Sequence, residues 1–214
     1  MKLGKPKKCQ ECKEEFTQSN SLTKVCSIKC AISLAKKKSK ETRQRDWKKK
    51  KAILKDQIKT RKDYMKELQP SVNKIARIID KSCPCISCGK TKKDVQYHGG
   101  HFYSTGARPS LRFNLMNIFL QCSVCNNHLS ANLLNYELGL INTFGKENSD
   151  YIKYDLPKEF ETLKLTEEEL KDAIPKARAA IRMLEKDEPI MSYNSEQRLE
   201  LRRTINKELG IYGE

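Results

Sequence analysis

Residues 83–89 read CPCISCG, and residues 122–128 read CSVCNNH. Each stretch contains a Cys-x-x-Cys pair, and thirty-three residues lie between the two pairs. Two such pairs supply the four thiolates of a tetrahedral zinc site. We therefore predict a structural Zn²⁺ ion held by Cys85, Cys88, Cys122 and Cys125. The odd cysteine, Cys83, is not expected to be a ligand.

A second cysteine group stands near the N-terminus, where residues 9–30 read CQECKEEFTQSNSLTKVCSIKC. Its spacing also suits a tetrahedral zinc site, so we expect a zinc ribbon or treble-clef knuckle with Phe16 in its small core. Disulfides are the alternative, but the first residues, MKLGKPKKCQ, lack the apolar core of a secretion signal, and cytosolic thiols stay reduced. The expected ligands are Cys9, Cys12, Cys26 and Cys30.

The charge of the chain indicates a polyanionic partner. The 214 residues carry a formal net charge of +16, and only 37% of them are hydrophobic. Basic residues outnumber acidic ones most strongly between residues 36 and 66. Nucleic acid fits this charge, because each neutralised phosphate releases counterions. A membrane fits less well, since no apolar run is long enough to span it.

Residues 31–68 have the pattern of one long, charged helix. A three-and-four spacing gives it a single apolar stripe, made of Trp47, Leu54, Ile58, Met65 and Leu68. We expect its cations to lie along a nucleic-acid backbone, with a merely solvated helix as the alternative. The central cluster is Lys48, Lys49, Lys50 and Lys51. Pro70 is expected to break this helix and to open the next one.

The three histidines of the chain all lie within or beside the central cysteine group: His98, His101 and His128. Two apolar segments, VQYHGGHFY and the region around LRFN, flank a loop with glycine and proline, which predicts a β-hairpin. Cys122 and Cys125 would then open a helix that carries Asn126. Arg108 and Arg112, in the loop and the second strand, suit bidentate contacts with phosphate.

This order of strand, loop, strand and helix, closed by a cysteine clamp, resembles the ββα-metal fold of the HNH endonucleases. In that family a histidine ends the first strand, an asparagine precedes the second cysteine pair, and a metal-binding His or Asn follows that pair directly. His101, Asn117 and Asn126 stand at these places. Zinc-stapled phage resolvases of the endonuclease VII type are similar in using asparagine at the last place. The resemblance implies that Asn126 is a metal ligand.

A closer resemblance covers most of the chain. The N-terminal cysteines, the basic helix and the motifs CISCG, GGHF, LRFN and QCSVCNNH together are similar to the NinG, or Rap, recombination proteins of lambdoid phages. That resemblance implies a structure-specific endonuclease of the Holliday junction resolvase type, acting on branched DNA such as four-way junctions and D-loops. It also implies a place in the cytoplasm of a bacterial host, with phage recombination proteins as partners. This chain departs from the family at His98, where an aspartate is expected.

These residues would support hydrolysis of a phosphodiester. A histidine with a pKa of about 6.5 can act as a general base close to neutral pH. His101 is assigned that role, oriented by the side-chain carbonyl of Asn117 or by a backbone carbonyl. One Mg²⁺ or Mn²⁺ ion, held by Asn126 with His98 or His128, would stabilise the phosphate. A symmetric four-way junction needs two cuts, which favours a homodimer.

The predicted fold class is α+β, made of small zinc-dependent modules. We expect an N-terminal zinc module at 1–35, a basic helical linker at 36–80, an HNH-like ββα-metal core at 81–145 and a helical C-terminal region at 146–214. In the last region, Thr166 and Glu169 suit a capping box. Two other functions fit the composition: a non-catalytic zinc-finger protein that binds DNA as a recombination mediator or regulator, and, on charge alone, an RNA-binding or ribosome-associated protein.

Overall fold

The computed structural model describes residues 6–18, 20, 22–91, 93–186 and 192–212, except for the side chain of Ser130. The chain divides into two compact units, residues 1–59 and 60–214. The boundary lies inside the segment 36–80, which the sequence suggested as a single linker. None of the described helices is both long enough and apolar enough to cross a membrane.

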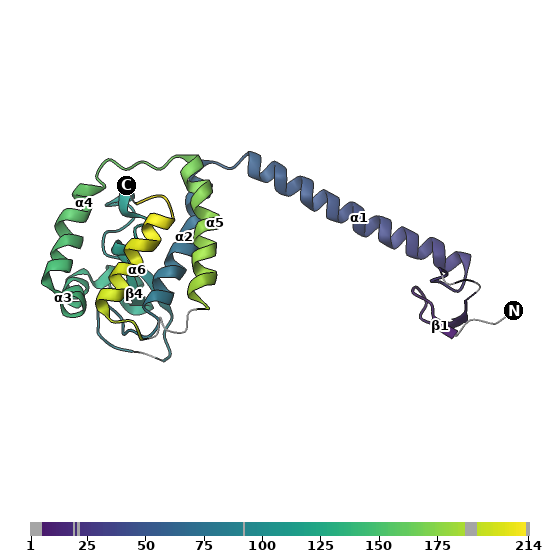
Figure 1. Cartoon of the computed structure of the whole chain (residues 1–214), viewed down its shortest axis with the longest axis horizontal. Coiled ribbons are helices and arrows are strands. Elements are labelled where there is room, and N and C mark those ends of the chain that lie inside the picture. The colour runs from purple at the N-terminus through teal and green to yellow at the C-terminus, as the bar shows by residue number, and fades with distance from the viewer. Residues whose placement is uncertain (1–5, 19, 21, 92, 187–191, 213–214) are drawn as a thin grey trace. The chain divides into compact units, whose positions relative to one another are not determined.

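The first unit contains a small antiparallel sheet and one long helix (Figure 1). β1 (Pro6–Lys8) pairs with β2 (Glu15–Thr17). α1 (Ile28–Gln57) begins after Ser27, whose side chain accepts a hydrogen bond from the backbone N–H of Cys30. Phe16, expected in a small core, is only half-buried. The described residues of this unit therefore form little apolar core.

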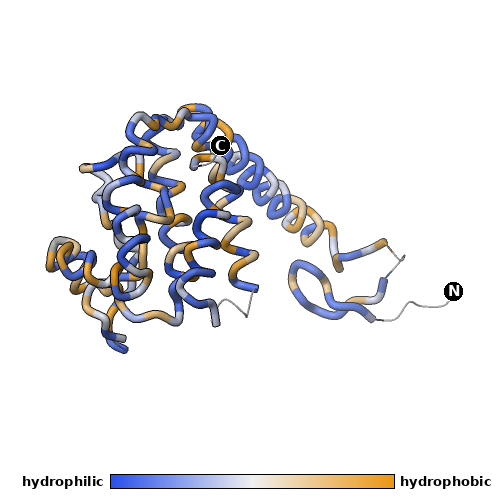
Figure 2. Tube along the Cα trace, turned by 60° about the vertical axis from the view of Figure 1, so that its left-hand side comes forward, coloured by the Kyte–Doolittle hydropathy of each residue, from blue (hydrophilic) through white to orange (hydrophobic). Residues whose placement is uncertain are grey.

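α1 is mostly polar, although Trp47, Ile53 and Leu54 are exposed on its surface. It has no buried residue, and hydrophilic residues cover most of its length (Figure 2). The predicted single helix with one apolar stripe is wrong, because the stripe is exposed at Trp47 and the chain leaves the helix after Gln57. α2 (Arg61–Ile79) begins anew after Thr60. The carboxylate of Asp63 accepts hydrogen bonds from the N–H and the hydroxyl of Thr60, which fixes this start.

The prediction that Pro70 breaks a helix is also wrong, because α2 continues through it. Its apolar face packs on α5 (Glu167–Leu184), and Figure 1 shows the two helices side by side. This packing outweighs the cost of an interior proline, which is about 3 kcal/mol. The buried contact residues include Leu68, Val72, Ile75 and Ile79 of α2 and Leu170, Ile174, Ala177 and Ile181 of α5. The predicted capping box of Thr166 and Glu169 begins α5 and is confirmed.

The sheet of the second unit pairs β3 (Tyr97–His101) with β4 (Ile118–Cys122) in antiparallel register. The second strand therefore lies later than predicted. The LRFN region forms turns instead, between the 3₁₀ segments η1 (Pro109–Leu111) and η2 (Leu115–Asn117). Arg112 consequently lies in a buried turn and not in a strand.

The segment after β4 also differs from the predicted helix. Cys122 ends the strand, and η3 (Val124–His128) makes a single wide helical turn. α3 (Leu133–Asp150) begins only after this turn. Asn126 therefore lies on a short turn between strand and helix.

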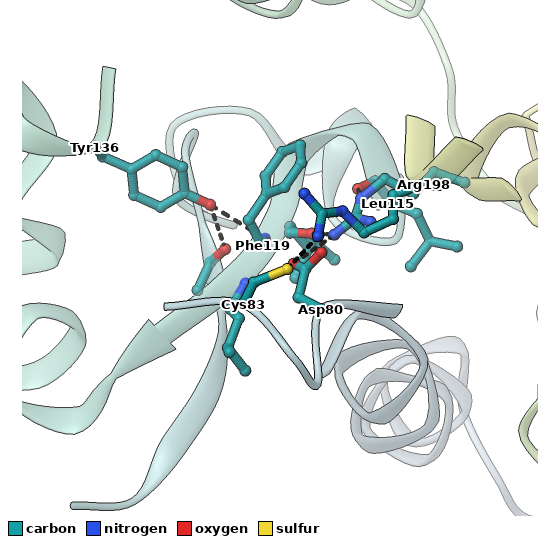
Figure 3. A network of polar contacts seen from close by, with 10 residues as sticks. Asp80, Cys83, Leu115, Phe119, Tyr136 and Arg198 are labelled. Atoms are coloured by element: carbon teal, nitrogen blue, oxygen red, sulfur yellow. Dashed lines mark hydrogen bonds and ion pairs between the residues drawn. The ribbon is translucent and has the colours of Figure 1, made fainter. Parts of the chain in front are cut away.

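The C-terminal region shares its core with the sheet. α6 (Ser195–Glu208) begins with a capping box formed by Asn194 and Gln197. It places the fully buried Arg202 beside Asp80 at the end of α2, with 2.7 Å between Nη2 and Oδ2. Asp80 also accepts a hydrogen bond from the N–H of Leu120 on β4. One buried ion pair thus joins α2, β4 and α6; Figure 3 shows its surroundings, with Asp80 labelled.

Candidate active site and metal centres

The central cysteine group is assembled as predicted. The four sulfur atoms of Cys85, Cys88, Cys122 and Cys125 lie within 4.8 Å of one another, and all four are free thiols. The backbone N–H of Cys122 points at the sulfur of Cys85 over 3.3 Å. Gly89 follows the first pair with φ of +63°, a left-handed conformation that favours glycine. This tetrad suits one structural zinc ion.

The N-terminal group forms a second tetrad, in which the sulfur atoms of Cys9, Cys12, Cys26 and Cys30 also lie within 4.8 Å of one another. The sulfur of Cys12 is 3.5 Å from that of Cys26. Among the described residues, these two tetrads are the only sets of three or more His, Cys, Asp or Glu side chains close enough to hold a metal. The three histidines therefore do not form a metal cluster with acidic residues.

Cys83 lies outside both tetrads. Its sulfur contacts the guanidinium group of Arg198 on α6, as Figure 3 shows. Burial raises the pKa of the Cys83 thiol, and the charge of Asp80 raises it further. The raised pKa favours the protonated thiol of Cys83.

His101, the predicted general base, ends β3 and is half-buried. Its Nε2 lies 2.9 Å from the backbone carbonyl oxygen of Arg112. A carbonyl can only accept, so Nε2 carries the proton, and Nδ1 is the nitrogen that can take one from a substrate. Burial lowers the pKa of His101, which favours the neutral ring at neutral pH. Of the two predicted ways to orient His101, the structure has the backbone carbonyl.

Asn117 shapes the loop and is not bonded to His101. It is fully buried. Its Oδ1 accepts from the N–H of Tyr103, and its Nδ2 donates to the carbonyl groups of Tyr103 and Leu111 at 3.0 and 3.2 Å. These three bonds hold the chain after β3 against the turn that carries Arg112. Asn117 therefore acts on His101 through the position of the Arg112 carbonyl.

Gly100 marks the place where β3 lies closest to η3. A Cβ atom at Gly100 would overlap Oε1 of Gln121 and would lie 3.1 Å from Oδ1 of Asn126. The Nδ2 of Asn126 donates a hydrogen bond to Oδ1 of Asn127 at 2.8 Å. Oδ1 of Asn126 is therefore the amide atom that faces β3. Oε1 of Gln121 is buried and has no hydrogen-bond partner in the described part of the chain. Two amide oxygens thus meet at Gly100, the residue before His101 in the chain, and this donor type suits Mg²⁺ or Mn²⁺.

Gln121 is the residue that sequence reasoning missed. It is fully buried in β4, whose other residues are apolar apart from Cys122. Its Nε2 donates to the hydroxyl of Ser87 at 2.6 Å, in the loop of the central tetrad. The sequence signal for Gln121 was a polar residue within the otherwise apolar run IFLQC. A buried amide at such a position needs hydrogen-bond partners.

The other two histidines are placed differently. His98 lies opposite Gln121 in the strand register, so its side chain leaves β3 on the same face as Gly100. Its Nε2 is buried without a described partner. His128 is exposed at the end of η3. Of the two alternatives for a second metal ligand, His98 is the one that shares a face with Asn126.

The predicted DNA-binding residues lie at the surface or near His101. Arg108 is exposed in the loop after β3, and the half-buried Arg112 holds His101 through its carbonyl group. On α1, the cluster Lys48, Lys49, Lys50 and Lys51 is exposed. Exposure is what contact with phosphate requires, and the contact itself stays a prediction.

Fold and site together define an α+β protein with two cysteine tetrads, each able to hold a structural zinc ion. The chain belongs to the NinG family: the family described as "Bacteriophage Lambda NinG protein" matches residues 1–188. The family membership expected from the sequence is therefore confirmed.

Several phage proteins are similar to this chain over most of its length. "Protein ninG" of Escherichia phage 933W is 38% identical over 167 residues, which cover 71% of this chain and 83% of that protein. "Protein ninG" of Escherichia phage lambda is 37% identical over 169 residues, covering 71% and 82%. "Protein ninG" of Salmonella phage P22 is 36% identical over 162 residues, covering 69% and 79%. No solved structure matches this chain.

Proposed function

We propose that this protein is a metal-dependent, structure-specific endonuclease that cuts branched DNA recombination intermediates such as Holliday junctions and D-loops. The observation that carries the proposal is the pair His101 and Asn126. A histidine of lowered pKa ends a strand, and a free amide oxygen faces the neighbouring Gly100. This pairing beside a cysteine tetrad is what the resemblance to HNH endonucleases implies.

The residues of the chain have distinct roles in the proposed hydrolysis. Nδ1 of His101 takes a proton from water, while the Arg112 carbonyl holds the opposite edge of the ring. The hydroxide attacks phosphorus, the bond to the 3′ oxygen breaks, and a proton from solvent reaches that oxygen. Arg108, exposed in the adjoining loop, supplies positive charge to the phosphate.

The donor set next to His101 fits a single divalent cation. Asn126 would hold Mg²⁺ or Mn²⁺ together with His98 or His128, and Oε1 of Gln121 is a further oxygen donor. When bound, the ion supplies Lewis-acid stabilisation of the charge on the phosphate and the leaving oxygen.

The test uses purified full-length protein and a synthetic four-way DNA junction, with Mg²⁺, with Mn²⁺ and with EDTA. We expect metal-dependent cuts by the wild type, and none by His101→Ala, although this variant still binds the junction. Asn126→Ala should also fail to cut, whereas the matched control Asn142→Ala, an exposed asparagine on α3, should cut normally. If the wild type never cuts, the proposal fails.

The alternative function is a non-catalytic DNA-binding protein that mediates recombination or regulates transcription. The exposed lysines of α1 and the two tetrads would serve it equally well. It requires that His101 be dispensable. A His101→Ala variant that supports recombination as well as the wild type would favour this alternative.

A further inference from the structure

A groove of about 440 Å³ lies between α2 and β3. Its lining residues include Lys66, Gln69 and Arg77 of α2, Gly99 of β3 and Arg112 of the turn before β4. The carbonyl group of Arg112 also holds His101 at 2.9 Å. The groove is therefore lined by the residue whose carbonyl group contacts His101, the residue that we assign as general base.

The groove exists because β3 lies directly on α2. A Cβ atom at Gly99 would stand only 3.0 Å from the carbonyl oxygen of Asn73 and 3.1 Å from a methyl group of Ile118. Lys66 and Arg77 are eleven residues apart, about three helical turns, and so lie on one face of α2. Nη1 of Arg77 points at the carbonyl oxygen of Tyr97 over 3.5 Å, which anchors this face beside the strand.

The charge of the groove is positive and uncompensated. Of its described lining residues three are cationic and none is acidic. Within the described part of the chain, no carboxylate pairs with Lys66, Arg77 or Arg112. Two other charged residues of α2 are paired: Lys74 contacts Glu185 at 2.6 Å, and Glu67 contacts Arg178 at 2.9 Å. Lys66 and Arg77, by contrast, line the groove without a described carboxylate partner.

Polar atoms buried in the groove also lack hydrogen bonds. They are Nε of Arg112 and Oε1 of Gln69, both on residues that line the groove. Buried polar groups in proteins normally have a partner, so a polar ligand or water is expected there. Nε of Arg112 is a hydrogen-bond donor. Donors and free cations are what the acceptor oxygens of a phosphate require.

We infer that this groove binds a backbone phosphate of DNA next to the one that is cut. The inference rests on the proposed function, since it places the groove beside a scissile phosphate. Lys66 and Arg77 supply charge at the rim, and Arg112 supplies a donor from the floor. The groove thereby extends the DNA contact from β3, which ends at His101, onto α2.

The inference is tested by the double variant Lys66→Gln with Arg77→Gln in the full-length protein. Both side chains are exposed, so the fold should survive, as thermal melting would verify. The matched control is Lys171→Gln with Arg182→Gln, an exposed lysine and arginine on α5. The measurement is the affinity for a four-way DNA junction in EDTA at several salt concentrations. A further variant, Arg112→Gln, tests the donor on the floor.

We expect the salt dependence of binding, log K against log salt concentration, to become shallower by about 1 for each phosphate-contacting cation removed. The double variant should bind about tenfold more weakly or worse in moderate salt, and the control should match the wild type. Unchanged binding by the groove variant, an equal loss in the control, or tighter binding to an RNA junction would overturn the inference. So would a wild type that binds no DNA.

These outcomes separate the groove from the nuclease. EDTA prevents metal-dependent cleavage, so the binding result does not depend on catalysis. If the groove variant binds weakly but the wild type never cuts in Mg²⁺ or Mn²⁺, the groove is supported and the proposed nuclease fails. If the wild type cuts and the groove variant binds normally, the nuclease stands and the groove is excluded.

Discussion

The hydroxyl group of Tyr136 donates a hydrogen bond to the carbonyl oxygen of Gly100 over 2.8 Å. The same hydroxyl accepts a bond from the N–H of Phe119 at 3.1 Å. Gly100 and Phe119 face each other across β3 and β4, so one buried side chain of α3 ties the two strands beside His101. Burial raises the pKa of Tyr136 well above its ordinary value, which keeps the hydroxyl protonated. Figure 3 shows Tyr136 pointing toward the strand that carries Phe119.

Tyr136→Phe should therefore weaken the fold near the site. It leaves a buried carbonyl and a buried N–H without their partner, which costs about 1–3 kcal/mol of unfolding free energy. Denaturant unfolding followed by circular dichroism measures the loss. Tyr154→Phe, at an exposed tyrosine, is the control and should change stability by less than about 0.5 kcal/mol. Equal losses in the two variants would contradict the role of Tyr136.

The sequence was sufficient to predict both tetrads. Paired thiolate ligands of one ion are typically separated by two or three residues, so the spacing is visible without any structure. The order of histidine and asparagine likewise pointed to His101 and Asn126, and Oδ1 of Asn126 lies toward Gly100, the residue before His101. A backbone carbonyl was one of two expected partners of His101, but the sequence could not say which one, because the carbonyl of Arg112 has no sequence signature.

The second strand was misplaced for a physical reason. A short apolar run can be a buried strand or a buried turn, and periodicity alone does not distinguish them. Phe113 and Leu115 are fully buried, as a strand would require, but Asn114 accepts a bond from the N–H of Met116 and starts a turn. The error at Pro70 has a similar origin, since contacts with α5 decided the path of α2.

The buried ion pair between Asp80 and Arg202 should be sensitive to loss of one partner. Asp80→Ala leaves an unpaired charge in the core and should cost about 3–5 kcal/mol of unfolding free energy. The double variant Asp80→Leu with Arg202→Met should lose much less, because no charge remains buried. Asp172→Ala, which removes an exposed pair with Lys176, is the control and should cost less than about 1 kcal/mol. If the double variant lost as much unfolding free energy as the two single variants added together, this account would be contradicted.

Metal analysis should find about two zinc ions per chain. Cys125→Ser and Cys12→Ser should each lower this to about one, because each removes a ligand from a different tetrad. Cys83→Ser is the matched control, since Cys83 contacts Arg198 and belongs to neither tetrad. Only Cys125→Ser should also lower the melting temperature of the unit 60–214. A zinc content that falls in Cys83→Ser would show that the ligands are assigned wrongly.

The pH dependence of cleavage should reflect His101. The base acts in its neutral form, which predominates above its pKa. Burial lowers that pKa below the ordinary value of about 6.5, so the rate should decline only as pH falls beneath that value. The charge of Arg112 also lowers the pKa, so Arg112→Gln should move the midpoint upward. Single-turnover rates between pH 5 and pH 8 check both statements, and a wild-type midpoint above 6.5 would refute the assignment.

The metal preference of cleavage should depend on His98 and not on His128. His98 shares a face of β3 with Gly100, where Oδ1 of Asn126 lies, whereas His128 is exposed. Imidazole is a softer ligand than carboxylate, so His98→Asp should raise the rate with Mg²⁺ relative to the rate with Mn²⁺. His98→Asp should also lower the concentration of Mg²⁺ that gives half of the maximal rate, relative to that of Mn²⁺. His128→Ala is the comparison variant and should leave both quantities unchanged. If instead His128→Ala changes the preference and His98→Asp does not, the second ligand is His128 and η3 must carry two of the ligands.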